Sequence, residues 1–563
     1  MQHDGAVGQG RAEGRRSGMR ADVVVVGGGP VGLLVAAELS ARGVDTAVLE
    51  TLPAVSERPK ATTLHARAVQ CLTRRGHLPW QAATGDGPDQ VSRFHFAGIP
   101  ALSVTAPATE PVPLLKTRQA DLERSFEARA RALGARVFRG HRVVAMSQGP
   151  AGSRLTARAE HGEAVWEADW VVAADGARST VRELAGFTSD AWPATVSAMS
   201  AVVDPPDDPA ALAPGWHHTP RGWIVVTKTP AGGAHVRTLD ATGPHHDRGR
   251  PPTAEEFRAE VARIAGREVP LGRVTAVARF SDFSRLAHHY RRDRVVLAGD
   301  AAHVHFPIGG QGLTTGVLDA MALGWRLALV ARGAAGTGLL DAYAHERRPV
   351  AQRIIADTRA QLDLMRPEPE GELGSGRRLM AELLELDAVR RHLAAKVSGQ
   401  DTVAPPLTDR PSPWEGRFLA NMSLLPVADP AADDASGSPG GPTDVVSLLG
   451  EGRPLLLLFG DDDGEGDGYG DLREEAAPWA RLLRVVRTAS AAPRTPDQAS
   501  PAAAPPPGEP VPAVLLRPDG YIAWTPGAGG LAEALTAYFG PPCPAGAAPA
   551  PAARRGVSSP EPA

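Results

Sequence analysis

The sequence predicts an α/β protein of several domains, in which a largely parallel sheet is joined by a sheet-rich segment and a smaller C-terminal unit. The chain has 563 residues, enough for on the order of three to four domains at roughly 150 residues each. Hydrophobic residues make up 43% of the chain and charged residues 22%, as in globular proteins. Strand-like apolar runs alternate with helical stretches before residue 190 and after residue 286, which is typical of a parallel α/β sheet.

The composition excludes several classes of protein. With 60 basic and 64 acidic residues, the chain has no basic excess for nucleic acid. Its two cysteines, Cys71 and Cys543, cannot build a disulfide framework or a four-cysteine zinc site. No purely apolar run reaches the roughly eighteen residues of a spanning helix, and residues 1–18 lack the apolar core of a secretory signal. We therefore expect a cytoplasmic protein without nucleic-acid or membrane partners, and residues 1–18 as a disordered extension.

A strand, tight turn, helix and second strand open the folded part of the chain. Residues 23–26 are four valines, an apolar helical stretch runs to Leu39, and residues 44–49 form a second apolar strand that ends in Glu50. The turn contains the G-x-G-x-x-G pattern with Gly27, Gly29, Pro30 and Gly32. This order of elements is the context that a dinucleotide-binding site of the Rossmann type requires.

Each residue of this turn has a physical task in binding a dinucleotide. Gly27 allows the tight turn, Gly29 lets a pyrophosphate approach the backbone, and Gly32 lets the helix pack on the strand. The start of the helix offers free N–H groups and partial positive charge to phosphates. Glu50 can accept hydrogen bonds from a ribose diol, which favours an adenine dinucleotide with an unphosphorylated ribose.

Two later strands also end in an acidic residue beside glycine. Residues 170–174 run into Asp175-Gly176, and residues 294–297 run into Gly299-Asp300. Glycine allows a close approach at a strand end, and an ionised acid can hold ligand hydroxyls there. A helix at residues 119–133 and a strand at 135–138 complete the pattern.

The remaining segments differ from the first in composition and in the elements that they predict. Residues 190–285 contain a predicted hairpin, 223–229 with 235–239, and a helix with a capping box of Thr253 and Glu256. A long helical stretch begins near Leu313, and helices continue to about residue 397. Proline, serine, aspartate and glycine dominate residues 401–445, which predicts a linker. The last unit, 446–541, contains predicted strands at 455–459, 483–486, 513–516 and 521–524, and an Ala/Pro-rich tail, 542–563, is predicted to be disordered.

Several separated motifs resemble those of the class A flavoprotein monooxygenases, the para-hydroxybenzoate hydroxylase-like aromatic hydroxylases, and among them the polyketide hydroxylase branch. The motifs are the Gly27 turn, the run from Ala174 to Arg182, the run from Gly299 to His303 with Pro307 and Gly309 to Leu313, and the run from Tyr343 to Val350. Together they extend from residue 19 to about residue 400, in the order and spacing of that family.

The resemblance implies a domain organisation. An FAD-binding Rossmann-like domain takes residues 19–190 and 286–400, interleaved with strands of the substrate-binding domain at 190–285. The linker at 401–445 then leads to a C-terminal thioredoxin-like domain at 446–541. Because the chain has no C-x-x-C pair, that last domain has no dithiol redox site.

The resemblance also implies which residues contact FAD. Beyond Gly27, Gly29, Pro30, Gly32 and Glu50, these are Lys60, Gln119, Asp175, Gly176, Gly299, Asp300, Pro307, Gly309, Gly310, Gly312, Leu313 and Thr314. The flavin ring is expected on the loop 307–312, whose backbone N–H groups and helix start stabilise negative charge on reduced flavin. Two positions depart from the family: Thr314 stands where it usually has Asn, and Lys60 where many members have Arg, which removes bidentate hydrogen bonding.

The reaction implied is hydroxylation of a polycyclic aromatic polyketide. NADPH, or NADH, reduces FAD, O₂ adds to form the flavin C4a-hydroperoxide, and one oxygen atom passes to an electron-rich ring. One G-x-G-x-x-G pattern in the chain suits an enzyme whose reductant has no binding domain of its own. Two alternatives stay open: Baeyer–Villiger oxygenation of a polyketide ketone, and a non-catalytic protein that binds flavin or polyketide.

No residue stands out as a catalytic acid, base or nucleophile, because an ionised phenol activates its own ring. His303 and His305 have i, i+2 spacing without an accompanying acid cluster, so they are interpreted as loop histidines and no metal site is predicted. Substrate identity, a biosynthetic or detoxifying role and the oligomeric state, a homo-oligomer included, stay open.

Overall fold

The computed structural model describes most of the chain. The described residues are 19–78, 90–149, 152–204, 213–229, 232–245, 250–367, 375–425, 427, 442–460, 468–490, 493, 511–527 and 529–542. The predicted extension at 1–18 and residues 543–563 of the predicted tail lie outside them.

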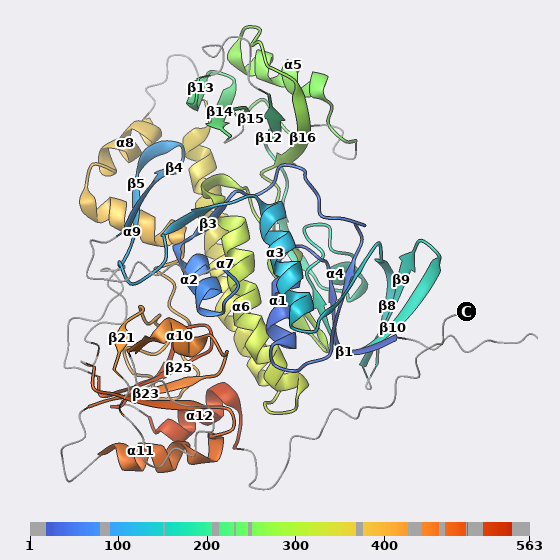
Figure 1. The fold of residues 1–563 in the computed structure, drawn as a ribbon. Coiled ribbons are helices and arrows are strands. Elements are labelled where there is room, and N and C mark those ends of the chain that lie inside the picture. Colours follow the sequence, from blue (N-terminus) through green and yellow to red (C-terminus); the bar gives the residue numbers. More distant parts are fainter. Residues whose placement is uncertain are drawn as a thin grey trace, which may run out of the picture.

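The largest sheet has eight strands and lies toward the right in Figure 1. Across it lie β18 (Arg291–Arg292), β19 (Val295–Leu297), β10 (Gly162–Ala173), β1 (Met19–Val26), β2 (Thr46–Glu50) and β7 (Arg136–Arg139), with β8 (Arg142–Gly149) and β9 (Gly152–Ala159) added beside β10. The five strands from β19 to β7 run parallel. The predicted parallel α/β sheet is thereby confirmed, and the carboxyl ends of these strands meet at one edge.

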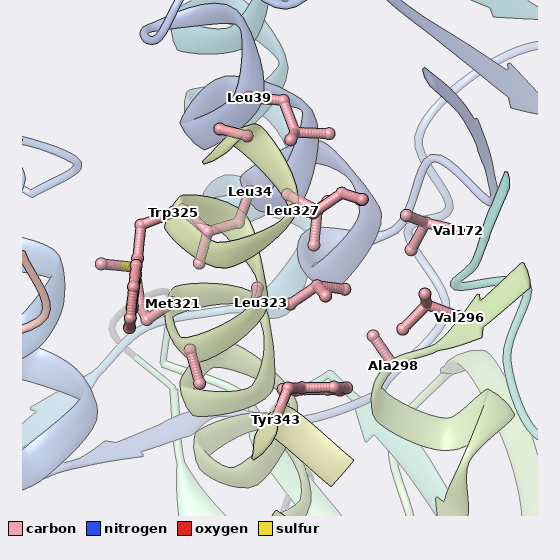
Figure 2. Packing of buried hydrophobic residues seen from close by; sticks show 14 of the residues in the cluster. Leu34, Leu39, Val172, Val296, Ala298, Met321, Leu323, Trp325, Leu327 and Tyr343 are labelled. Atoms are coloured by element: carbon pink, nitrogen blue, oxygen red, sulfur yellow. The ribbon is translucent and has the colours of Figure 1, made fainter. Parts of the chain in front are cut away.

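Helices cover the sheet and form most of the core. They are α1 (Pro30–Ser40), α2 (Ala66–Arg74), α3 (Gln119–Ala132), α4 (Thr180–Leu184), α6 (Gln311–Ala331) and α7 (Gly338–Met365). Figure 2 shows α6 contributing Met321, Leu323 and Leu327 to a cluster that includes Leu34 of α1 and Val296 of the sheet. Within the described residues, the stretch Ile308–Ala331 has the length and apolar composition of a membrane span, but it is almost wholly buried. It is therefore a core helix.

A five-stranded antiparallel sheet forms the sheet-rich unit. Its order is β13 (Gly215–Thr219), β14 (Gly222–Lys228), β15 (Ala234–Asp240), β12 (Ser197–Val203) and β16 (Val274–Ser281). The predicted hairpin is β14 with β15, and α5 (Ala254–Ala265) begins with the predicted capping box. Figure 1 shows α5 on the side of this sheet away from α6 and α7.

The two faces of this sheet contact different parts of the protein. Val236 of β15 packs with Phe257 of α5 in one cluster, whereas Leu239 of the same strand packs in another with Phe306 and Met365. Since side chains alternate along a strand, His235 and Arg237 share the face of Leu239. That inner face points to the chain around residue 307.

Short elements complete the space between the sheets. They are β3 (Thr63–His65) with β6 (Leu114–Lys116), the hairpin of β4 (Gln90–Phe96) and β5 (Ile99–Ala106), the three-stranded sheet of β11 (Ser189–Trp192), β17 (Ser284–Ala287) and β20 (His303–Val304), and the helices α8 (Ser375–Leu383) and α9 (Asp387–Ser398). Two short 3-10 turns, η1 (Gly299–Ala301) and η2 (Ile308–Gly310), precede α6.

The C-terminal unit has a thioredoxin-like sheet. It contains β21 (Ser423–Leu424), β22 (Thr443–Asp444), α10 (Val445–Leu449), β23 (Leu455–Phe459), α11 (Gly468–Ala476), η3 (Ala477–Trp479), β24 (Arg484–Thr488), β25 (Ala513–Leu516), β26 (Ile522–Trp524) and α12 (Leu531–Phe539). The sheet order is β24-β23-β25-β26, with only β25 antiparallel to the others. This arrangement confirms the thioredoxin-like expectation.

Residues 401–425 differ from the linker predicted at 401–445. Trp414, Leu419 and Leu424 are buried in one cluster with strands of the C-terminal unit, and Phe418 forms a β-bridge with Tyr521. The mostly polar composition of the segment predicted a linker. These four large apolar residues nevertheless bury enough surface to hold the segment against the C-terminal unit.

Buried ion pairs join the C-terminal unit to the helices of the main domain. Arg517 contacts Glu346 of α7 at 3.1 Å and Asp519 at 2.5 Å, and Arg326 of α6 contacts Glu346 at 2.5 Å. The indole N–H of Trp325 donates to Asp519 at 3.1 Å. We call Arg326, Glu346, Arg517 and Asp519 the domain contact.

Candidate functional site

The glycine turn after β1 contains two glycines that the surrounding backbone requires and one glycine that faces open space. Gly27 has φ +109°, and a Cβ on Gly32 would lie 2.0 Å from the Gly27 carbonyl oxygen. Both glycines are therefore required by the fold itself. A Cβ on Gly29 would meet nothing within 4 Å, and no side chain caps α1 at this residue. The space beside Gly29 and the uncapped helix start thus suit a diphosphate.

Glu50 lies across the turn and holds it. Its carboxylate accepts the N–H of Gly28 at 2.6 Å and the N–H of Leu52 at 2.7 Å. A carboxylate has about four lone-pair sites, so these two bonds leave acceptor capacity for a ribose diol. Glu50 therefore orders the loop and remains able to bind a ligand.

Gln119 and Lys60 lie near the same end of the site. Gln119 is the first residue of α3, and its backbone N–H donates to the carbonyl of Ala61 at 3.0 Å, beside the exposed Lys60. One turn further along α3 the carboxyl of Glu123 is buried, and burial is the main cause of its raised pKa; Lys60 opposes the shift and Glu50 adds to it. Glu123 is not among the residues predicted from the sequence, although its i, i+4 spacing from Gln119 places both on one face of the helix.

Asp175 has a partner within its own turn. It accepts a hydrogen bond from the Ser179 hydroxyl at 2.5 Å and one from the N–H of Val181 at 3.1 Å, so it holds the start of α4. Burial raises the pKa of its carboxyl, against these hydrogen bonds. Gly176 has φ +84° and open space where a Cβ would stand. Asp175 therefore has a structural role, and the open side of the turn is at Gly176.

Asp300 stands on η1, at the end of β19, and its side chain is exposed at the strand edge. Desolvation by the surrounding protein raises the pKa of its carboxyl, while His303 and Lys60 act in the opposite direction. Gly299 lies against α1, because a Cβ there would be 3.1 Å from Val31. The Gly27 turn, Asp175-Gly176 and Asp300 thus follow β1, β10 and β19, which neighbour each other in the sheet.

A buried network holds η1 in place. Asp319 of α6 accepts the N–H of Gly299 at 3.1 Å, contacts the His303 ring at 2.6 Å and pairs with Arg347 of α7 at 2.8 Å. His303 therefore has a structural role, and it lies buried on the strand β20, not in the loop that the sequence predicted. Asp319 was missed, because an acid in an apolar helix gives no signal until its partners are known. Within the described residues, no group of three or more His, Cys, Asp or Glu side chains could hold a metal ion.

The loop 307–312 leads into the start of α6. Gly309 and Gly310 have φ +73° and +64°, and α6 begins at Gln311, with Gly310 at its N-cap and no side-chain cap. Its first backbone N–H groups have no partner within the helix. This loop therefore presents N–H groups and partial positive charge to a ligand. Pro307 is exposed, whereas Leu313 is buried.

Thr314 is directed away from this opening. Its hydroxyl accepts the N–H of His65 at 3.0 Å, and the side chain is buried. His65 in turn contacts the carbonyl of Gly309 at 2.7 Å through Nε2. Burial lowers the pKa of His65 to about 4, so the ring is neutral at pH 7. The Thr314 side chain therefore holds the loop against β3. Only the backbone of Thr314 is left to contact a flavin.

Two buried side-chain amides converge on the loop, and the nitrogen of each lacks a hydrogen-bond partner among the described residues. A Cβ on Gly309 would lie 3.3 Å from Nε2 of Gln311 and 3.7 Å from Nε2 of Gln361 in α7. The Oε1 atom of Gln361 accepts the N–H of Ala97 at 3.1 Å, which fixes the amide orientation. Neither nitrogen has a hydrogen-bond partner among the described residues. Buried donors without partners are costly, so the pair fits the carbonyl oxygens of a flavin or of its substrate.

These features together fit an extended FAD molecule. Gly29 would leave room for the diphosphate, Glu50 would hold the adenosine end, and Gly309 with the two glutamine donors would hold the ring end. Val31 of α1 links the two ends, because it touches Gly299 and would lie 2.7 Å from a Cβ on Gly316 of α6. Gln361 was also missed from the sequence, since it lies far from the glycine motifs in a helix without a distinctive pattern.

Family models match most of the chain. The model described as FAD binding domain matches residues 20–358, and that described as aromatic-ring hydroxylase, C-terminal, matches residues 412–542. The chain is 33% identical over 540 residues to 12-dehydrotetracycline 5-monooxygenase/anhydrotetracycline 6-monooxygenase of Streptomyces rimosus, covering 93% of this chain and 100% of that protein.

Two further relatives carry names for different reactions, one a hydroxylase and one a synthase. The structure of CabE, an aromatic hydroxylase from angucycline biosynthesis, superposes with a TM-score of 0.78 and 32% identity, covering 93% of this chain and 100% of CabE. A dialkyldecalin synthase of Streptomyces rugosporus is 34% identical over 525 residues, covering 92% of this chain and 99% of that protein. The extent of the family matches and the FAD-shaped site agree, and the chain belongs to the class A flavin-dependent monooxygenases, the aromatic-ring hydroxylases.

Proposed function

We propose that this protein hydroxylates a polycyclic aromatic polyketide, using FAD and NADPH. FAD, when bound, supplies the activation of O₂ and the transfer of one oxygen atom to an electron-rich ring. The relatives named for anhydrotetracycline and for angucycline biosynthesis support this substrate class. We further propose that the enzyme acts in the cytoplasm, where NADPH is available, and that the residues described above hold the cofactor.

One observation carries the proposal. Phe306 and Ile308, on either side of Pro307, belong to an apolar cluster with Trp223 of the five-stranded sheet, Phe96 of the β4–β5 hairpin and Met365 of α7. The loop proposed to hold the flavin is therefore one wall of an aromatic and apolar region. A flat polycyclic ring system bound in that region would lie next to the flavin, with water excluded by the surrounding side chains.

The chain's own groups suit an oxygen transfer that needs no protein nucleophile. The start of α6 stabilises negative charge beside the loop. His305 is half-buried, and desolvation by the surrounding protein lowers its pKa to about 4. Its Nδ1 contacts the carbonyl of Phe306 at 2.8 Å, so Nδ1 carries the hydrogen and Nε2 is an acceptor. The loop 307–312 is therefore lined by two neutral histidines, His65 and His305, and by the amide donors of two glutamines.

The test uses the purified holoenzyme with anhydrotetracycline, aklavinone and other polycyclic phenols. We expect a flavin absorption spectrum, substrate-stimulated NADPH oxidation, and one ¹⁸O atom in the product when the reaction runs under ¹⁸O₂. NMR of the product distinguishes ring hydroxylation from the lactone of a Baeyer–Villiger reaction. Substrate-independent NADPH oxidation that gives only hydrogen peroxide with every phenol would contradict the proposal.

The dialkyldecalin synthase motivates a second candidate function. Its identity to this chain, 34%, is within one percentage point of that of the tetracycline monooxygenase of Streptomyces rimosus, so the same fold supports a protein not named as an oxygenase. In that case a polyene substrate would give a product of unchanged mass, with neither NADPH nor O₂ consumed. Measuring product mass and NADPH in the same reaction distinguishes the two functions.

A further inference from the structure

Two cations lie side by side between the five-stranded sheet and the main domain. Arg237 of β15 donates from Nη2 to the Thr62 hydroxyl at 3.3 Å and contacts Nδ1 of His235 at 2.9 Å. Lys116 of β6 donates to the hydroxyl of the next residue, Thr63, at 2.9 Å. In the part of the chain that the structure describes, no carboxylate pairs with either cation. We call Lys116 and Arg237 the cation pair.

The cation pair adjoins the loop proposed to hold the flavin. Thr63, which accepts from Lys116, lies 3.4 Å from the point where a Cβ on Gly310 would stand. His65, two residues further on, contacts the carbonyl of Gly309 at 2.7 Å. The two cations are therefore separated from the flavin loop by a single short strand, β3.

A row of aromatic rings extends from the cation pair. The Lys116 ammonium lies 5.3 Å from the centre of the Phe94 ring. Phe94 stacks on His95 with ring centres 4.5 Å apart and planes 22° apart, and His95 meets Trp216 at 4.5 Å. Such a row offers flat surfaces to a flat ligand.

Electrostatics indicate the charge of that ligand. Burial lowers the pKa of Arg237 to about 10, and burial and Arg237 lower the pKa of Lys116. Burial lowers the pKa of His95 and of His235 to about 3, so both rings are neutral. Two like charges in a partly desolvated place repel each other and lack compensation. An anion bound between them would remove both costs.

We propose that Lys116 and Arg237 form a subsite for the oxyanion of a polycyclic aromatic substrate, whose rings lie along Phe94 and His95. The inference rests on the proposed function and specifies its substrate class as compounds with an acidic phenol or enol. Binding the deprotonated form leaves its electron density in the ring, which is the form that an electrophilic oxygen attacks. The cation pair would thus select the reactive ionisation state before chemistry begins.

Equilibrium binding to the holoenzyme tests the subsite without turnover. The probes are alizarin, a 1,2-dihydroxyanthraquinone whose anion absorbs at longer wavelength than its neutral form, and its 2-methyl ether, which cannot form that anion. Tryptophan fluorescence quenching gives both dissociation constants, and the visible spectrum gives the ionisation state of bound alizarin. The variants are Arg237→Gln and Lys116→Gln. The control is Arg273→Gln, the same chemical change at an exposed residue paired with Asp204.

We expect wild type and Arg273→Gln to bind alizarin as its anion, about tenfold or more tighter than the ether. In Arg237→Gln and Lys116→Gln this preference should fall to about threefold or less, with bound alizarin shifted toward its neutral spectrum. Equal binding of both probes to wild type, or an undiminished preference in both variants, would overturn the subsite.

NADP⁺ titrations distinguish a second source of the oxyanion. If the cation pair served the phosphates of the reductant, the two variants would weaken NADP⁺ binding and leave the alizarin preference intact, which would overturn the assignment to substrate. Failure of the proposed function is a separate result, because absence of oxygen transfer leaves the ionisation-dependent binding of alizarin measurable.

Discussion

The domain contact and the cation pair both bring charged side chains of different elements together, the first in the buried interior and the second with Arg237 half-buried and Lys116 exposed, and they differ in what compensates the charge. In the domain contact, Arg326 and Arg517 share Glu346, and Asp519 completes the set. The acids raise the pKa of Arg517 well above its usual value, against burial, and the cations hold the pKa of Glu346 at about 2. Around Lys116 and Arg237, the hydrogen-bond partners among the described residues are hydroxyl and imidazole groups, and the Phe94 ring lies against Lys116.

Charged groups held for the fold and charged groups held for a ligand can be distinguished by their partners within the protein. A charge that is paired with an opposite charge inside the protein contributes to the fold. A charge without such a partner is uncompensated until a ligand of opposite charge binds. The glycines of the first turn show the same contrast: Gly32 is required by the adjacent backbone, and Gly29 faces open space.

The largest expected effect comes from breaking the paired region. Glu346→Ala removes the acid that both Arg326 and Arg517 contact, so two buried cations lose a partner. We expect the free energy of unfolding to fall by about 3–5 kcal/mol, measured by urea denaturation. Arg273→Gln, at the exposed pair with Asp204, should change it by about 0–1 kcal/mol. A loss no larger than this control would show that the domain contact does not stabilise the fold.

Acid should weaken the same contact. The pKa of Glu346 is about 2 in the folded protein and 4.5 for an unperturbed glutamate, so the unfolded chain binds its proton first as the pH falls. The stabilisation is therefore complete above about pH 4.5 and is lost as the pH falls toward 2. Glu346→Gln lacks this titration, so its unfolding free energy should fall less between pH 4.5 and 3 than that of wild type, as urea titrations can show. Parallel pH profiles would contradict the assignment.

Local sequence patterns predicted the residues that the fold itself requires. Gly27, Gly32 and the strand at 23–26 could be read from sequence, because a tight turn is dictated by residues adjacent in the chain. Lys116, Arg237 and Gln361 could not, because β6, β15 and α7 meet only through tertiary packing. The segment 401–425 was predicted as a linker for the opposite reason: its polar residues outnumber the few large apolar residues that bury it.

Substitutions in the glycine turn sharpen the comparison at the cofactor. Gly32→Ala places a Cβ 2.0 Å from the Gly27 carbonyl oxygen, so we expect destabilisation of about 1–3 kcal/mol from overpacking. Gly29 has φ −77° and open space, so Gly29→Ala should change apoprotein stability by about 0.5 kcal/mol or less. Its affinity for FAD should nevertheless fall about tenfold, or 1.4 kcal/mol, by fluorescence titration of the apoprotein. Unchanged FAD affinity would show that no phosphate approaches this backbone.

The smallest expected effect has the opposite sign and tests the unpaired region. Arg237→Met removes a half-buried charge that repels Lys116 and replaces it with an apolar side chain of similar length. The lost hydrogen bonds to Thr62 and His235 offset part of the gain, so we expect the ligand-free protein to become more stable by about 1 kcal/mol. Urea denaturation at pH 7 measures this change, with Arg273→Gln as the control. A loss comparable to that of Glu346→Ala would mean that Arg237 is held for the fold, and the distinction between the two regions would then fail.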